Sequence, residues 1–239
     1  MKLKLFVIFI ALAAIFNCCE CVVDNDTEKI ITPTEFANIL FINAVSDDEL
    51  ANILVYSASK ILDKIDTINN QWDITEGKYK KVGIKVSNQK NILRLVSLND
   101  TTRILFNSVV DLKKDSNYTF VAFGINKYIQ SIFMSDYIEA YNPDNVYFRF
   151  FNAIPDSPEL FVKVETEGYL NEFLIKAAQS TRIYTLPNGE YNISIINRDS
   201  SFKVQYPEII FQQGKMNNFV LKGKYKTKSI KFGIVSVEI

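Results

Sequence analysis

The stretch FINAVSD at residues 41–47 returns as FFNAIPD at residues 150–156, so both copies read Phe-x-Asn-Ala-x-x-Asp. The two copies lie 109 residues apart. A second match joins residues 103–124 to residues 202–223 without a gap, at an offset of 99, and both segments end in glycine. Two blocks that recur in the same order indicate an internal repeat. We therefore expect two copies of one structural unit, with about ten extra residues in the first copy.

The repeated unit has the residue pattern of β-strands. Because side chains alternate along a strand, the run VYFRFFN at residues 146–152 places Val146, Phe148, Phe150 and Asn152 on one face. Turn signals such as the Pro-Asn-Gly at residues 187–189 separate these runs. Short strands with turns about every 8–12 residues are typical of a β-sandwich. The sequence predicts one exception, a short helix over residues 63–70.

These motifs resemble the domain of unknown function 4397 family. The likeness lies in the Phe-x-Asn-Ala-x-x-Asp motif followed by Leu-Phe-Val at residues 160–162, in LPNGEY at residues 186–191, and in NYTFVAFG at residues 117–124. The family comprises β-sandwich modules, often paired, on exported bacterial proteins, and it implies no reaction and no catalytic residue. The second copy departs from the pattern with Asn217 and Asn218 in place of Tyr-Thr. The first copy has no clear Pro-x-Gly turn.

The N-terminus has the pattern of an export signal. Lys2 and Lys4 precede twelve apolar residues, 5–16, which suit a signal peptide but are too few to span a bilayer as a helix. We expect a signal peptide over residues 1–17, followed by a lipid anchor and flexible tether over residues 18–35.

All three cysteines lie within residues 18–21, directly after the apolar run. Here the sequence resembles bacterial lipoproteins, which are cut immediately before a cysteine that is then acylated. The stretch IFNC at residues 15–18 resembles a relaxed lipobox and favours Cys18 as the lipidated residue. Asn17 departs from the small residue usual before that cysteine, so Cys19 is the alternative.

The fold expected for the rest of the chain is all-β, with two tandem immunoglobulin-like or transthyretin-like β-sandwich domains. The first domain is expected over residues 36–142 and the second over residues 143–239. The boundary is placed near Pro143, because proline and its polar neighbours interrupt the strand pattern there. A fragment beginning near Asp144 is expected to fold alone.

Composition excludes several classes of function. The chain has no histidine, which rules out Ser-His-Asp and Cys-His catalysis and histidine-ligated zinc. Its 27 basic and 27 acidic residues give no net charge, whereas nucleic-acid binding needs a surplus of positive charge. No glycine-rich phosphate loop is present. We expect no metal, no cofactor, no catalytic residue and no nucleic-acid partner.

Three features of the sequence are candidates for a binding site. The repeated Asn-Ala-x-x-Asp follows an apolar strand in both copies, which favours a turn over a site, because Asn and Asp side chains bind nearby backbone groups. Trp72, the single tryptophan, falls where the extra residues of the first copy lie, and either recognises a partner or covers the core. The third feature is a row of lysines spaced by two, Lys222, Lys224, Lys226 and Lys228.

The lysine row has two interpretations. On a strand, residues spaced by two share one face, so the row could form a basic ridge for a polyanion. Lysines also protect the edge strands of sheets against aggregation, and this second interpretation is favoured because such edges are common.

The export signal, the internal repeat and the missing histidine and cysteine chemistry together favour a non-enzymatic, lipid-anchored protein of the bacterial cell envelope. It is expected at the outer membrane or cell surface, with a binding or structural role. Its expected partners are the membrane, through the lipid, and a protein or polyanionic glycan. The alternative is a surface glycan hydrolase that uses paired carboxylates. A cleft between the domains lined by two facing carboxylates would favour the hydrolase, and closed, side-chain-filled sandwiches would favour the first hypothesis.

Overall fold

The structure, a computed structural model, describes residues 36–46, 52–58, 62–69, 79–86, 91–97, 99–100, 102–125 and 128–238. Within these residues every regular element is a β-strand, which confirms the all-β class. The first half contains β1 (Phe36–Val45), β2 (Asn52–Ala58), β3 (Leu62–Asn69), β4 (Tyr79–Lys85), β5 (Asn91–Ser97), β6 (Ile104–Val110), β7 (Asn117–Ile125) and β8 (Tyr128–Ser135). The second half contains β9 (Val146–Ala153), β10 (Leu160–Thr166), β11 (Tyr169–Ile175), β12 (Gln179–Ser180), β13 (Tyr184–Leu186), β14 (Glu190–Asn197), β15 (Lys203–Ile210), β16 (Lys215–Lys224) and β17 (Ser229–Glu238).

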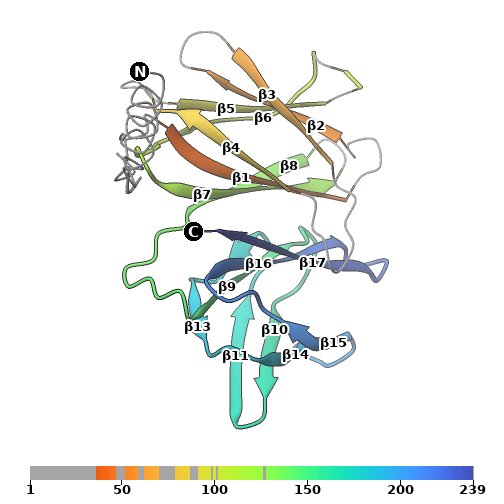
Figure 1. The fold of residues 1–239 in the computed structure, drawn as a ribbon. Helices are drawn as coiled ribbons and strands as arrows, with labels where there is room; N and C mark the ends of the chain where they lie inside the picture. The colour runs from red at the N-terminus through yellow and green to blue at the C-terminus, as the bar shows by residue number, and fades with distance from the viewer. Residues whose placement is uncertain are drawn as a thin grey trace, which may run out of the picture. The chain divides into compact units, whose positions relative to one another are not determined.

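The strands form four sheets whose order repeats (Figure 1). The first half has the orders β4-β1-β7-β8 and β3-β2-β5-β6. The second half has β12-β9-β16-β17, with β13 also paired to β9, and β11-β10-β14-β15. Taking β12 and β13 as one interrupted strand, each half carries the same strand order. The repeat seen in the sequence is therefore a repeat of topology.

Register agrees with the two sequence offsets. Strands β1 and β7 run parallel with Phe41 opposite Phe120, and β9 and β16 run parallel with Phe150 opposite Phe219. The aligned phenylalanine rings also meet, with centroids 5.5 Å apart in the first half and 4.8 Å apart in the second. The aligned glycines at the ends of the second match have nearly equal φ angles, 131° at position 124 and 132° at position 223.

Each half has its own apolar core between its two sheets. The first core takes buried side chains from β1, β4, β7 and β8 of one sheet and from β5 and β6 of the other. The second core takes them from β9, β13, β16 and β17 and from β10, β11 and β14. Burying one large apolar side chain contributes roughly 1.5–3 kcal/mol, so each half holds a substantial hydrophobic core of its own.

A third group of buried residues, the junction cluster, joins the two halves. It consists of Leu40, Ile42, Ala44, Val121 and Phe123 from the first half and Tyr147, Phe151, Ala153, Met216, Val220, Val235 and Val237 from the second. Because side chains alternate along a strand, β1 and β9 send one set of residues into their own core and the other set into the junction. This accounts for β9 being buried at every position.

The helix expected over residues 63–70 is wrong, because residues 62–69 form strand β3. This strand pairs antiparallel with β2, with Tyr56 opposite Lys64. It lies at the edge of its sheet, where one face and one side can remain polar. Pairing with β2 therefore overrides the weak local pattern. In the described part of the chain, no helix has the length and apolar character needed to cross a bilayer.

Candidate functional site

The repeated asparagine forms a turn in both copies. Asn43 Oδ1 accepts a hydrogen bond from the Val45 N–H at 3.1 Å, and Asn152 Oδ1 accepts one from the Ile154 N–H at 3.2 Å. Both asparagines are buried. The favoured interpretation, in which these side chains satisfy backbone groups where the strand ends, is confirmed for both asparagines.

The aspartate of the second copy also has a structural contact. Asp156 accepts hydrogen bonds from the backbone N–H groups of Tyr225 at 2.9 Å and Lys226 at 3.3 Å. It therefore holds the turn between β16 and β17 against the end of β9. The matching Asp47 lies outside the described residues, as do Trp72, Cys18 and Cys19.

The lysine row does not lie along one face of a strand. Strand β16 ends at Lys224, so Lys226 and Lys228 fall in the turn that follows. Lys222 is only 6% exposed. Strand β16 is also not an edge strand, since β9 and β17 flank it, so the favoured interpretation as edge protection is wrong. Which strands have two neighbours depends on contacts distant in sequence, and residue spacing does not carry that information.

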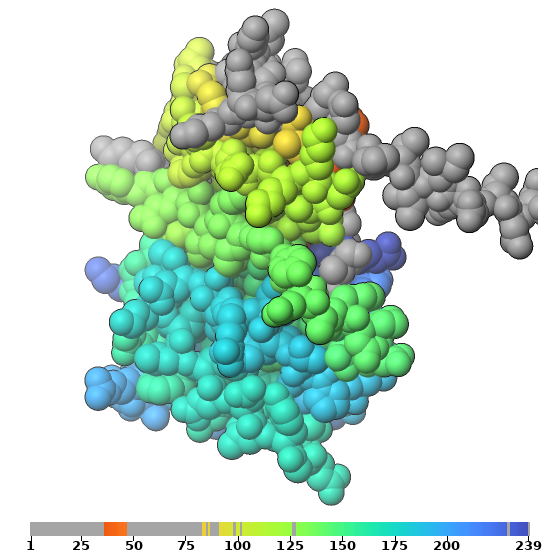
Figure 2. Space-filling model, turned by 90° about the vertical axis from the view of Figure 1, so that its left-hand side faces the viewer, coloured from red at the N-terminus to blue at the C-terminus, as the bar shows by residue number. Residues whose placement is uncertain are grey.

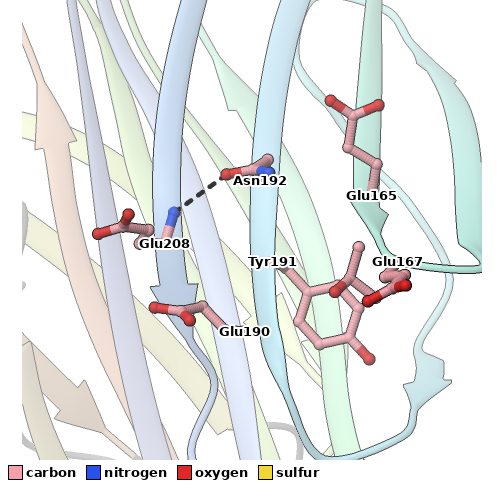
Figure 3. Close-up of a pocket in the computed structure, with 7 residues that line it drawn as sticks. Glu165, Glu167, Glu190, Tyr191, Asn192 and Glu208 are labelled. Carbon is pink, nitrogen blue, oxygen red and sulfur yellow. Dashed lines mark hydrogen bonds between the residues drawn. The ribbon is translucent and has the colours of Figure 1, made fainter.

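An acidic pocket lies where strands β10, β14 and β15 come together, at the tip of the β10–β11 hairpin that projects at the lower end of Figures 1 and 2. It encloses about 440 Å³. Figure 3 shows its lining, with Glu190 and Glu208 on one side and Glu165 and Glu167 on the other. The complete lining is Glu165, Thr166, Glu167, Glu190, Tyr191, Asn192 and Glu208.

A β-bulge shapes this pocket. The pairing of β14 with β15 shifts register between Tyr191 and Ile193. Glu208, on the facing strand, has a φ angle of 58° and donates its backbone N–H to Asn192 Oδ1 at 3.2 Å. The Tyr191 hydroxyl donates to the Pro187 carbonyl oxygen at 2.8 Å, and burial raises the pKa of this phenol. The floor of the pocket is therefore fixed by backbone contacts.

The glutamates of the pocket are well solvated. Glu167, Glu190 and Glu208 are exposed, and Glu165 is half-buried. The acid of a glycosidase typically sits in an apolar enclosure that keeps it protonated, which these exposed side chains do not provide. Among the described residues, no three His, Cys, Asp or Glu side chains are grouped so that they could hold a metal ion. The arrangement suits weak attraction of cationic groups more than acid–base chemistry.

A buried ion pair spans the junction between the halves. Arg149 on β9 donates from Nη2 to Asp136 Oδ1, just after β8, and the two side chains are 2% and 4% exposed. Arg149 Nε also donates to Asn218 Oδ1 at 2.8 Å, and Thr119 Oγ1 donates to Asp136 Oδ2 at 2.9 Å. The guanidinium carbon lies 5.0 Å from the centre of the Phe151 ring.

Two opposing effects act on the pKa of Arg149 in this ion pair. Burial lowers the pKa of the Arg149 guanidinium, while the charge of Asp136 and its hydrogen bond raise it. Desolvating two charges is costly, and their attraction offsets that cost only when the remaining polar atoms are also bound. Here Thr119 and Asn218 supply those contacts, one from each half.

Sequence reasoning missed both the acidic pocket and the ion pair. Glu165, Glu190 and Glu208 come from three strands and Glu167 from the β10–β11 turn, so no short motif contains all four. Arg149 did carry a signal, since it is the one charged residue within the otherwise apolar run at 146–151. A charge that is forced into a buried strand requires a partner, and only the fold identifies Asp136 as that partner.

Comparison with known proteins gives no family. No family model matches the chain, and no curated protein matches it. Among solved structures, the chain is similar to a leucine-rich repeat protein from Bacteroides thetaiotaomicron VPI-5482, with 10% identity and a TM-score of 0.21. The likeness covers 80% of this chain and 27% of that chain, so this chain spans about a quarter of that protein's length. A likeness this weak carries no argument about fold or function.

Proposed function

We propose that the chain is a non-enzymatic, lipid-anchored protein of the bacterial cell envelope with a binding or structural role. In this proposal residues 36–142 and 143–239 are two tandem β-sandwich domains of immunoglobulin-like or transthyretin-like type, similar to domain of unknown function 4397 modules. The repeated strand order and the separate core of each half support the two-domain arrangement.

The observation that carries the proposal is the filled junction between the halves. A two-domain glycan hydrolase would be expected to open a cleft there with two facing carboxylates. Instead, twelve buried apolar residues occupy the junction. The carboxylate of Asp136 is buried and bound to Arg149 and Thr119, which gives it a structural contact in the junction.

The acidic pocket is the one observation that favours the alternative, a surface glycan hydrolase. The two hypotheses separate in an assay for new reducing ends, with envelope and capsular polysaccharides as substrates. The proposed function requires no release by the wild-type protein. Release that is lost in a Glu165→Gln, Glu190→Gln variant would establish the hydrolase and overturn the proposal.

The anchor gives the first prediction. Changing Cys18 to alanine is expected to release the protein from the membrane fraction or to block its processing, because several acyl chains contribute about 0.8 kcal/mol per buried methylene. Detergent phase partitioning and gel mobility measure both outcomes. Cys19→Ala is the matched control and should leave partitioning unchanged. If Cys18→Ala still enters the detergent phase at normal size, Cys18 is not the lipidated residue and Cys19 takes that assignment.

The domain boundary gives the second prediction. A fragment beginning at Asp144 is expected to show a β-type circular dichroism spectrum, because the second core lies entirely within the second half. It should also associate at high concentration, since removing the first half exposes junction residues such as Tyr147, Phe151 and Val220. Sedimentation velocity tests the association. A disordered spectrum would show instead that the two halves depend on one shared core.

A further inference from the structure

Two turns that are distant in sequence meet at one end of the second half (Figure 1). Tyr225, in the β16–β17 turn, accepts a hydrogen bond at its hydroxyl from Asn197 Nδ2 at 2.7 Å. Its ring also packs edge-on against Phe202, with centroids 5.6 Å apart. Asn197 and Phe202 bracket the β14–β15 turn. Tyr225 therefore fixes one turn against the other.

The paired turns concentrate positive charge. Their segments, residues 197–203 and 224–231, contain six cationic side chains and one carboxylate, in a chain whose net charge is zero. Lys224 is half-buried and the other five cations are exposed. That carboxylate, Asp199, accepts a hydrogen bond from the Ser201 backbone N–H at 3.0 Å. A second carboxylate, Asp156, comes from outside these segments and accepts hydrogen bonds from the backbone N–H groups of Tyr225 and Lys226. We call this surface the basic end, and its cations are Arg198, Lys203, Lys224, Lys226, Lys228 and Lys231.

Protection of strand edges accounts for only part of this concentration of charge. Lys203 on β15 and Lys231 on β17 lie on edge strands, whereas Arg198, Lys226 and Lys228 lie in turns, where they protect no strand edge. Lys226 and Lys228 lie within one four-residue turn, and placing like charges close together is unfavourable. A partner with the opposite charge would turn this repulsion into attraction.

We propose that the basic end binds a polyanionic glycan, a polysaccharide that carries sulfate, phosphate or uronate groups. This inference rests on the proposed function and names its ligand class. A soluble polymer fits better than an anionic bilayer, because peripheral membrane sites add exposed apolar side chains that enter the lipid. None of the exposed large apolar residues found in the described part of the chain belongs to these two segments.

The test uses the full-length protein in detergent and heparin as the polyanionic probe. Wild type should be retained on immobilised heparin at about 50 mM salt and released as salt rises, because counterions compete for the same charges. Neutral dextran should not retain it. A Lys226→Gln, Lys228→Gln variant is expected to bind heparin roughly 25-fold more weakly, since each lysine near an anionic surface contributes about fivefold.

The matched control removes the same charge elsewhere. Lys113 and Lys114 are exposed in the link between β6 and β7, so Lys113→Gln, Lys114→Gln should bind heparin as wild type does. Equal weakening in both variants, or no retention of wild type, would overturn the inference. A further arm uses phosphatidylcholine vesicles that contain about 30% phosphatidylglycerol, which gives a strongly anionic surface. Binding to these vesicles without binding to heparin would overturn the inference in favour of a membrane. Any of these failures leaves the proposed function standing, because the Cys18 and reducing-end experiments test that separately.

Discussion

Replacing Arg149 with methionine is expected to lower the free energy of unfolding by about 3–5 kcal/mol. The substitution keeps an apolar side chain against Phe151 but leaves the Asp136 carboxylate buried without its counter-charge. It also removes the donor to Asn218. The large cost follows from the uncompensated charge and the lost hydrogen bonds, because a buried ion is stable only when it is paired.

Urea denaturation of Arg149→Met measures this loss. The double variant Arg149→Met, Asp136→Leu should recover most of the stability, since no charge then remains in the junction. The exposed pair of Lys163 and Glu172, 3.0 Å apart, supplies a matched control. Lys163→Met should cost less than about 1 kcal/mol. If Arg149→Met costs no more than this control, the ion pair does not hold the halves together.

Changing Gly124 to alanine is expected to cost at least about 3 kcal/mol. Gly124 has a φ angle of 131°, which residues with a side chain rarely adopt. A Cβ at this position would lie 2.1 Å from the backbone oxygen of Tyr128, and that oxygen cannot move without disturbing the pairing of β7 with β8. The free-energy costs of backbone strain and of steric overlap therefore add in this variant.

Thermal and urea unfolding of three alanine variants test this expectation. Gly83 is the control, because an added Cβ would meet nothing closer than 3.8 Å, so Gly83→Ala should change stability by less than about 1 kcal/mol. Gly223 has a φ angle of 132° at the repeated position. Gly223→Ala should therefore be costly as well. A harmless Gly124→Ala would show that β7 has a different conformation in solution.

Strand β9 shows how far the sequence could predict the fold. Its alternating pattern correctly placed Phe148 and Phe150 on one face, and both lie in the second core. The same pattern placed Tyr147, Arg149 and Phe151 on the opposite face but did not show that this face is buried as well. Burial there comes from the first half of the chain, which no local pattern in β9 can reveal.

The candidate sites were less predictable than the strands. The two asparagine turns were predicted because each depends on a backbone group only two residues away. The lysine row was assigned to an edge strand, whereas the structure divides it between a central strand and a turn. Strand order within a sheet is set by pairing between distant segments, and residue spacing along the chain does not reveal that order.

The sequence by itself determined the internal repeat and the β class of the described residues. These follow from residue identity and from side-chain alternation, which are properties of short segments. Only the tertiary structure decided that Arg149 pairs with Asp136, that four glutamates line one pocket and that Tyr225 holds two basic turns together. Each of these depends on side chains from distant segments of the chain meeting, and that outcome is set by the free energy of the whole fold.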